Sequence, residues 1–158
     1  MFLGEQALKL DTKNRLVVPG KFRTFLTQDD RKGFFMVVNP TRGERCLRLY
    51  PHSTWSRVQR SLMRQADGVA DPAEFLRLVA SHADFAPIDA QFRFVVPQKL
   101  VDWAHLGRDV VMAGTLDWME IWDPGELESI AEQTREKHRP MLARALWAPP
   151  DEGPAKRP

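Results

Sequence analysis

The sequence LDTKNRLVVPGK at residues 10–21 recurs 78 residues later as IDAQFRFVVPQK at residues 88–99. Both copies begin with an apolar residue and an Asp, and an Arg follows four positions after the Asp. Three apolar residues, a Pro and, two positions further on, a Lys complete each copy. Matches at so many positions in one register indicate an internal duplication, which sets the architecture of the whole chain.

Each copy predicts a strand, a tight turn, a second strand and a short helix. In the first copy, a strand over residues 3–10 leads to Asp11, whose carboxylate can accept hydrogen bonds from backbone N–H groups of the turn. Asn14 tolerates the left-handed backbone of a hairpin, and a strand over residues 16–18 follows. Pro19 suits the first turn of a helix. Six residues are expected to face the core from the two helices: Phe22, Phe25, Leu26, Leu100, Trp103 and Ala104.

A second hairpin is expected to complete each unit. Residues 34–38 and 46–50 flank a turn-rich loop in the first unit, and residues 110–113 and 118–122 flank a turn at residues 114–117 in the second. Between the units we expect a helix over residues 52–65 and another that begins after Asp71. A further helix should begin at Asp123-Pro124, and Pro140 should kink or end it. The tail from Ala148, rich in Pro and charge, is predicted to be disordered.

Composition excludes several classes of protein. The apolar runs are shorter than the roughly 18 residues of a membrane span, and the N-terminus does not resemble a signal peptide. The single cysteine, Cys46, forms no internal disulfide and is interpreted as a small buried hydrophobe in a reducing cytoplasm. Residues 1–82 hold 14 Lys and Arg against 8 Asp and Glu, whereas residues 83–158 hold 9 against 13. This asymmetry suggests that the first half meets a polyanion.

Catalytic patterns are weak in this sequence. The four histidines are scattered, and we find no phosphate loop, nucleophile elbow or metal-ligand spacing. His82, Asp84 and Asp89 are close in sequence, but surface charge explains them better than an acid–base site does. The expectation is therefore a protein that is not an enzyme and that uses no cofactor or metal.

Basic residues crowd around the first turn: Lys9, Lys13, Arg15, Lys21 and Arg23. At the tip of a projecting hairpin, Lys13 and Arg15 can approach phosphates or base edges, because the planar fork of Arg can grip either bidentately. The other interpretation is structural, since Asp11 can pair with Arg15, and Asp89 with Arg93. Spacing alone supports the DNA-contact and the structural interpretation equally. The two are compatible, because an Asp that fixes an Arg also preorganises that Arg for a ligand. Arg57, Arg60 and Arg64 are best explained as a solvated helix face.

These motifs resemble the MraZ family, bacterial proteins built from two SpoVT/AbrB-type units in one chain. The resemblance spans residues 1–147. It is carried by Met1-Phe2-Leu3-Gly4, by the two D-x-x-x-R-φ-φ-V-P motifs (φ, apolar), and by Leu49-Tyr50-Pro51 with Trp55. It implies an α+β fold: a duplicated swapped-hairpin, AbrB-like β-barrel pseudo-dimer with peripheral helices. The expected divisions are a first unit at 1–53, connecting helices at 54–81, a second unit at 82–125, a C-terminal helix at 126–147 and the tail at 148–158.

The resemblance also implies a function. The family are DNA-binding transcriptional regulators of the division and cell-wall gene cluster, which recognise direct repeats upstream of their own operon and assemble into rings. Carried over, this implies a repressor of its own operon that is a cytoplasmic, nucleoid-associated homo-oligomer. DNA contacts are expected at Arg15, Lys13, Lys9, Arg93 and Lys21, with Asp11 and Asp89 as the motif acids. The alternative is an AbrB-like protein-interaction module of the antitoxin type, because fold does not fix function.

The second motif departs from the first. Family members typically have Gly before each motif Arg, whereas this chain has Asn14 and Phe92. Asn keeps access to a positive φ, and Phe reaches it only at a cost. Ala90 and Gln91 also replace Thr12 and Lys13. We therefore expect the first hairpin to be the main DNA contact.

Overall fold

The structure is a computed structural model that describes residues 1–39, 41 and 43–147. The predicted disordered tail from Ala148 lies outside the described residues. The elements are β1 (Phe2–Lys9), β2 (Arg15–Val17), α1 (Gly20–Arg23), the short 3-10 helix η1 (Asp30–Lys32), β3 (Gly33–Val38), β4 (Cys46–Pro51), α2 (His52–Ala66), α3 (Pro72–Ser81), β5 (Ala83–Pro87), β6 (Arg93–Val95), α4 (Gln98–Trp103), β7 (Asp109–Leu116), β8 (Met119–Trp122) and α5 (Pro124–Trp147).

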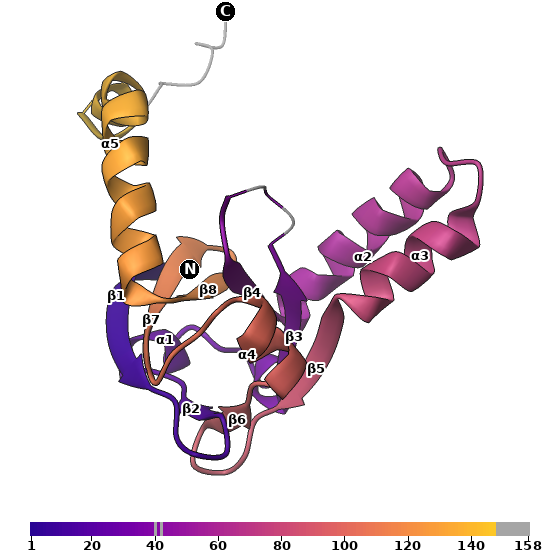
Figure 1. Ribbon diagram of the computed structural model, residues 1–158, viewed down its shortest axis with the longest axis horizontal. Coiled ribbons are helices and arrows are strands. Elements are labelled where there is room, and N and C mark those ends of the chain that lie inside the picture. The colour runs from indigo at the N-terminus through magenta and orange to yellow at the C-terminus, as the bar shows by residue number, and fades with distance from the viewer. Residues whose placement is uncertain (40, 42, 148–158) are drawn as a thin grey trace, which may run out of the picture. The chain divides into compact units, whose positions relative to one another are not determined.

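Residues Met1–Leu127 form one compact unit built on two antiparallel sheets. Six strands hydrogen-bond in the order β1-β7-β8-β4-β3-β5, and β2 and β6 form a separate two-stranded ribbon (Figure 1). Strands of the first copy pair repeatedly with strands of the second: β1 with β7, β2 with β6, β3 with β5 and β4 with β8. The two copies are therefore interlocked, and neither forms a sheet of its own.

The α+β class is confirmed, but the described strands do not form a closed barrel. The six-stranded sheet has β1 and β5 at its two edges, and the ribbon is not part of its hydrogen-bonded order. A physical reason lies in the length of β2 and β6. Each has three residues, lies between a tight turn and a proline, and pairs only with the other.

The ribbon is held against the larger sheet by aromatic packing. Leu16 and Phe94, opposite each other at the centre of the ribbon, are each 1% exposed. The Phe94 ring meets Phe34 of β3 edge to face, with ring centroids 5.4 Å apart. Because successive strand residues point to opposite faces, this packing directs the flanking residues of β2 and β6 away from the core.

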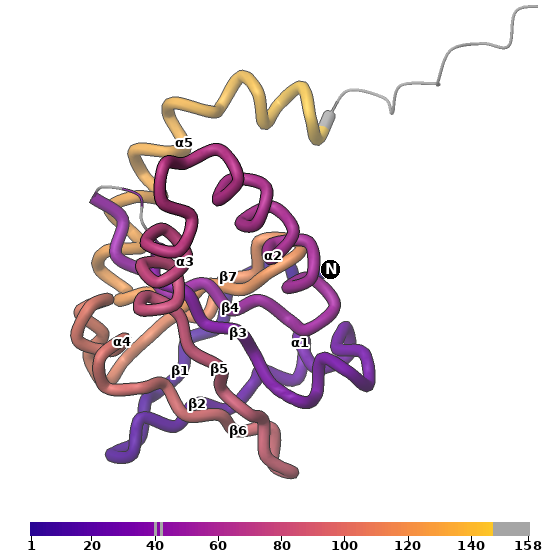
Figure 2. The backbone as a smooth tube through the Cα atoms, turned by 90° about the vertical axis from the view of Figure 1, so that its right-hand side faces the viewer, coloured from indigo at the N-terminus to yellow at the C-terminus, as the bar shows by residue number. Residues whose placement is uncertain are grey.

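Both hairpin turns that precede the ribbon strands protrude on the same side of this unit (Figure 2). Helices α2 and α3 run side by side and project from the sheet, toward the upper right in Figure 1. Asp71 caps α3 as expected, because its carboxylate accepts a hydrogen bond from Glu74 N at 2.9 Å. Asp30 joins η1 to the start of α2 by accepting from Ser53 N at 2.7 Å.

Two local expectations are wrong, and a third is met only in one of its two forms. Phe25 is 52% exposed, although Leu26 is buried as expected; both residues lie beyond Arg23, where α1 ends, so helical spacing does not set their orientation. Strand β7 continues to Leu116 and leaves a tighter turn than residues 114–117. Pro140 was expected to kink or to end helix α5, and it does not end the helix, which continues to Trp147. Because proline has no backbone N–H, Pro140 leaves one carbonyl of the preceding turn without its helical hydrogen bond.

Candidate nucleic-acid interface

The outer face of the β2–β6 ribbon presents two arginines and two valines. Arg15 lies opposite Val95, and Val17 lies opposite Arg93. Val17 is 41% exposed and Val95 50%. The two motif arginines, 78 residues apart in sequence, therefore share one small exposed surface. Strand alternation around the buried Leu16 and Phe94 is the sequence signal that could have placed the two valines on it.

Asp11 organises the first turn and its arginine together. Its Oδ1 accepts hydrogen bonds from Lys13 N at 2.8 Å and Arg15 N at 2.9 Å. Its Oδ2 accepts from Arg15 Nε at 2.5 Å. The D-x-x-x-R spacing thus lets one carboxylate close the turn and orient the guanidinium. Within the described residues, no hydrogen bond from a terminal nitrogen of Arg15 is formed, which leaves the N–H groups of these nitrogens available to a ligand.

The second turn repeats this arrangement. Asp89 Oδ1 accepts from Gln91 N and Arg93 N, both at 2.9 Å, and Oδ2 accepts from Arg93 Nε at 2.8 Å. Arg93 Nη2 also donates to Gln91 Oε1 at 3.2 Å. The structural interpretation of the motif as an Asp–Arg pair is therefore correct for both copies, and it is compatible with ligand binding.

The hydrogen bonds lower the pKa of both carboxyl groups, so that they stay charged further into acid than an ordinary Asp. The bond from Arg15 N, aided by those from the Arg15 side chain and Lys13 N, lowers the pKa of Asp11 from 3.8 to about 2. The bond from Arg93 N is the largest cause of the lowered pKa of Asp89. Each arginine is thus held by a full negative charge on its inner side, while its outer edge faces solvent.

The residues before the two arginines both adopt a left-handed backbone. Asn14 has φ 54° and Phe92 has φ 60°. The Asn14 carbonyl accepts from Val96 N, and the Phe92 carbonyl accepts from Val18 N, both at 2.8 Å. Each turn is therefore locked to the opposite strand of the ribbon. Phe92 does adopt the positive φ that favours glycine, and the geometry of the second turn matches that of the first.

The other expected basic residues are engaged differently. Lys9 Nζ lies 2.5 Å from Asp109 Oδ1 in an exposed ion pair, and Lys21 Nζ donates to the Glu5 carbonyl oxygen. Lys13 is exposed at the tip of the first turn. Of the expected DNA-contacting residues, the structure brings Arg15 and Arg93 together on the ribbon, with Lys13 at one end.

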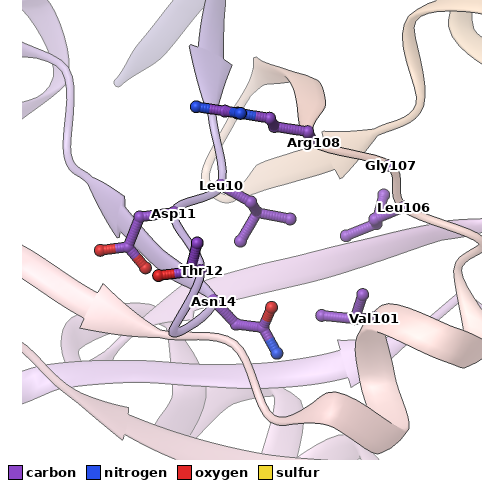
Figure 3. A pocket seen from close by; sticks show the side chains of 8 residues that line it. All are labelled: Leu10, Asp11, Thr12, Asn14, Val101, Leu106, Gly107 and Arg108. Carbon is purple, nitrogen blue, oxygen red and sulfur yellow. The ribbon is translucent and has the colours of Figure 1, made fainter.

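A pocket of 310 Å³ lies beside the first turn (Figure 3). The side chains of Leu10, Val101 and Leu106 converge on it, and the Arg108 side chain extends above Leu10. Asp11, Thr12 and Asn14 line it from the turn. Sequence reasoning missed Arg108, because no motif marks the loop between α4 and β7.

His82, Asp84 and Asp89 do not form an acid–base site. His82 Nδ1 lies 2.8 Å from the Leu78 carbonyl oxygen, Asp84 pairs with Lys99 at 3.3 Å, and Asp89 belongs to the second turn. Among residues 1–39, 41 and 43–147, no group of three or more His, Cys, Asp or Glu side chains could hold a metal ion. In the same residues, no helix has the length and apolar character needed to cross a membrane.

Comparison with known proteins identifies the family. A family model described as "MraZ protein, putative antitoxin-like" matches residues 1–76 and 79–146. The chain belongs to the MraZ family. Curated MraZ relatives carry the name "Transcriptional regulator MraZ". One from Acidithiobacillus ferrooxidans is 31% identical over 84% of this chain and 89% of its own length. Another, from Cutibacterium acnes, is 34% identical over 89% of this chain and 94% of its own. A third, from Leuconostoc mesenteroides, is 35% identical over 85% of this chain and 89% of its own length.

Proposed function

We propose that this MraZ-family chain is a transcriptional regulator that binds double-stranded DNA with the outer face of the β2–β6 ribbon. The observation that carries the proposal is the pair of Asp-fixed arginines, Arg15 and Arg93, on one exposed antiparallel ribbon. A two-stranded ribbon fits the major groove of B-DNA, which is about 12 Å wide. The relatives' name, transcriptional regulator, supports the same assignment.

Sequence specificity would come from the arginine forks. Arg15 already uses Nε to hold Asp11, so its terminal nitrogens remain to donate to a guanine O6 and N7. Arg93 likewise uses Nε to hold Asp89, but its Nη2 also donates to Gln91 Oε1, so Arg93 would have to release Gln91 to grip guanine with both terminal nitrogens. Lys13 would contact a phosphate. The exposed Val17 and Val95 are suited to contact with thymine methyl groups.

The interlocked copies support an AbrB-like pseudo-dimer within one chain, because a rotation about the Leu16–Phe94 pair would exchange the two motifs. One such ribbon makes few contacts with DNA. We propose that several chains assemble into a ring and engage direct repeats upstream of their own operon. Effective concentration then raises the overall affinity well above that of one chain. In this proposal the protein is a nucleoid-associated repressor of its division and cell-wall genes.

Binding to the DNA upstream of its own gene tests this function. The full chain should bind that fragment more tightly than a scrambled duplex, with a salt slope of about 0.9 per neutralised phosphate. The double variant Arg15→Ala/Arg93→Ala should lose the preference while keeping its oligomeric state. The matched variant Arg60→Ala/Arg64→Ala, on the exposed face of α2, should keep it. Equal binding of both duplexes by the wild type, together with one stoichiometric protein partner, would favour the antitoxin-type module instead.

A further inference from the structure

Phe92, at the tip of the second turn, lies under two guanidinium groups. The Arg23 Cζ atom is 4.7 Å from the centroid of the Phe92 ring, and the Arg31 Cζ atom is 5.8 Å from it. Arg23 ends α1 and Arg31 lies in η1, so both belong to the first copy, whereas Phe92 belongs to the second. The interlocking of the copies therefore creates a cluster that the sequence of neither copy contains.

Hydrogen bonds hold part of this cluster in place. Arg23 Nε donates to the Val18 carbonyl oxygen at 2.6 Å, and Val18 N donates to the Phe92 carbonyl oxygen at 2.8 Å. The Phe92 ring is half-buried and packs against the core. Arg23 is therefore positioned at the end of β2 next to the second turn, while the exposed Arg31 approaches the same ring.

The two guanidinium groups form no ion pair with a carboxylate from the described part of the chain. Stacking on an aromatic ring occupies the face of a guanidinium and leaves the N–H donors at its edge free. Two like charges that share one ring repel each other, and an anion bound between or beside them would relieve that repulsion.

The equivalent position of the first copy has a different chemistry. Asn14 Nδ2 donates to Gln98 Oε1 at 2.8 Å, and Gln98 Nε2 donates to Asp102 Oδ1 at 2.7 Å. This chain of contacts ends in a carboxylate, whereas the contacts of Phe92 end in two arginines. The two ends of the ribbon are thus related by sequence but differ in charge.

We infer that Arg23 and Arg31, organised by the Phe92 ring, form a binding site for backbone phosphate beside the second hairpin. The inference rests on the proposed DNA binding by the ribbon and extends it. Arg93 faces the bases, and the cluster next to it neutralises phosphates and so sets the position of the ribbon on the duplex. The loss of a Lys13 equivalent at Gln91 is compensated by basic residues from the other copy.

Salt dependence of DNA binding tests the site. In the full chain, Arg23→Gln/Arg31→Gln should lower the slope of log affinity against log salt by about 1–2, since each neutralised phosphate contributes about 0.9. Affinity should fall by a similar factor for the upstream fragment and for a scrambled duplex, because phosphate contacts carry no sequence information. The matched variant Arg60→Gln/Arg64→Gln removes the same charge from α2 and should leave the slope unchanged.

The role of the Phe92 ring is tested separately, by measuring the salt slope of Phe92 variants. Phe92→Leu keeps an apolar side chain that must adopt the same positive φ, but it removes the aromatic face. The slope of log affinity against log salt should therefore fall toward that of the double variant Arg23→Gln/Arg31→Gln. Phe92→Tyr keeps the face and should keep the wild-type slope. Thermal unfolding of each variant confirms that it is folded before binding is measured.

The outcomes separate this inference from the proposed function. Failure of the wild type to bind either duplex would overturn both. Wild-type binding that Arg15→Ala/Arg93→Ala abolishes, with an unchanged slope in Arg23→Gln/Arg31→Gln, would overturn the phosphate site alone. Equal decreases in slope for that variant and for Arg60→Gln/Arg64→Gln would assign the effect to net charge and also overturn the site.

Discussion

Arg15 and Arg93 occupy equivalent positions on the β2–β6 ribbon, each one residue from the buried Leu16–Phe94 pair at its centre. The Nε atom of each is bonded to the Asp four residues earlier. Both side chains are therefore ordered before a ligand arrives. Less conformational freedom remains to be lost on binding, which favours affinity.

Replacing the guanidinium of Arg15 with an ammonium keeps the positive charge but removes the bidentate donor pair. This substitution should separate base recognition from non-specific electrostatic binding to DNA. In Arg15→Lys, a single ammonium cannot both hold Asp11 and donate two parallel bonds to guanine. We expect affinity for the upstream fragment to fall about 10- to 100-fold, consistent with the roughly 1–3 kcal/mol of a bidentate base contact. Affinity for a scrambled duplex should change little. Fluorescence anisotropy with both duplexes measures this.

Arg64→Lys on α2 is the control for that substitution and should bind both duplexes as the wild type does. Loss of affinity for both duplexes by the same factor in Arg15→Lys would show that Arg15 contacts phosphate rather than a base.

The lowered pKa of Asp11 predicts that part of the folding stability is lost in acid. Its pKa is about 2 in the folded chain against an ordinary 3.8, chiefly because of the hydrogen bond from Arg15 N. A lowered pKa contributes stability that is complete above the unfolded value and is lost as the pH falls toward the folded value. The wild type should therefore unfold at a higher temperature than Asp11→Asn near pH 6, and the difference should shrink between pH 4 and pH 2.

Thermal unfolding followed by tryptophan fluorescence at several pH values measures the difference. The other carboxylates are common to both proteins, so their titration cancels in the comparison. A difference that stays constant down to pH 2 would show that the charge of Asp11 does not stabilise the turn.

The sequence predicted the duplication and most of the local structure. The β-branched and aromatic runs predicted both hairpins, β3–β4 and β7–β8, and the Asp–Pro pairs predicted where α3 and α5 begin. The D-x-x-x-R spacing predicted an Asp–Arg pair in each copy, because one carboxylate can reach both the turn and the Arg side chain. These features depend on residues a few positions apart.

Features that depend on contacts between distant parts of the chain could not be predicted from the sequence. Periodicity does not say that β2 pairs with β6, so it could not place Arg15 and Arg93 on one ribbon. Nor could it bring Arg31, in a three-residue helix with no periodic signal, against Phe92. Phe25 was misplaced for a related reason, since the length of α1 is set by packing rather than by the spacing of its apolar residues.

The left-handed backbone of Asn14 predicts a difference between two substitutions. Asn14→Gly removes the contact with Gln98 but suits φ 54°, so stability should change little. Asn14→Val places a β-branched residue there and should cost about 1–2 kcal/mol more. Chemical denaturation of the two variants gives the comparison. Equal stability of both would mean that the turn changes its geometry when the residue changes.

Glu120 should stabilise the outer face of the six-stranded sheet. Its Oε1 accepts from Arg48 Nε at 3.2 Å and Trp118 Nε1 at 3.1 Å, and its Oε2 accepts from Trp122 Nε1 at 3.0 Å. Glu120→Leu would leave these donors without their acceptor and should cost about 1–3 kcal/mol. Denaturant unfolding measures the loss. Glu132→Leu, at an exposed position of α5, should stay within about 0.5 kcal/mol of the wild type, and equal effects would contradict a specific role of Glu120.

Cys46 should report on global unfolding. It is fully buried in β4, and burial raises the pKa of its thiol to about 12. The reactive thiolate is thus suppressed and shielded in the native protein. At pH 8 we expect a thiol reagent to modify the native chain far more slowly than the denatured chain. The modification rate across a denaturant series should follow the tryptophan fluorescence transition, because Cys46 is the only cysteine. Rapid modification without denaturant would show that β4 opens while the rest of the fold is intact.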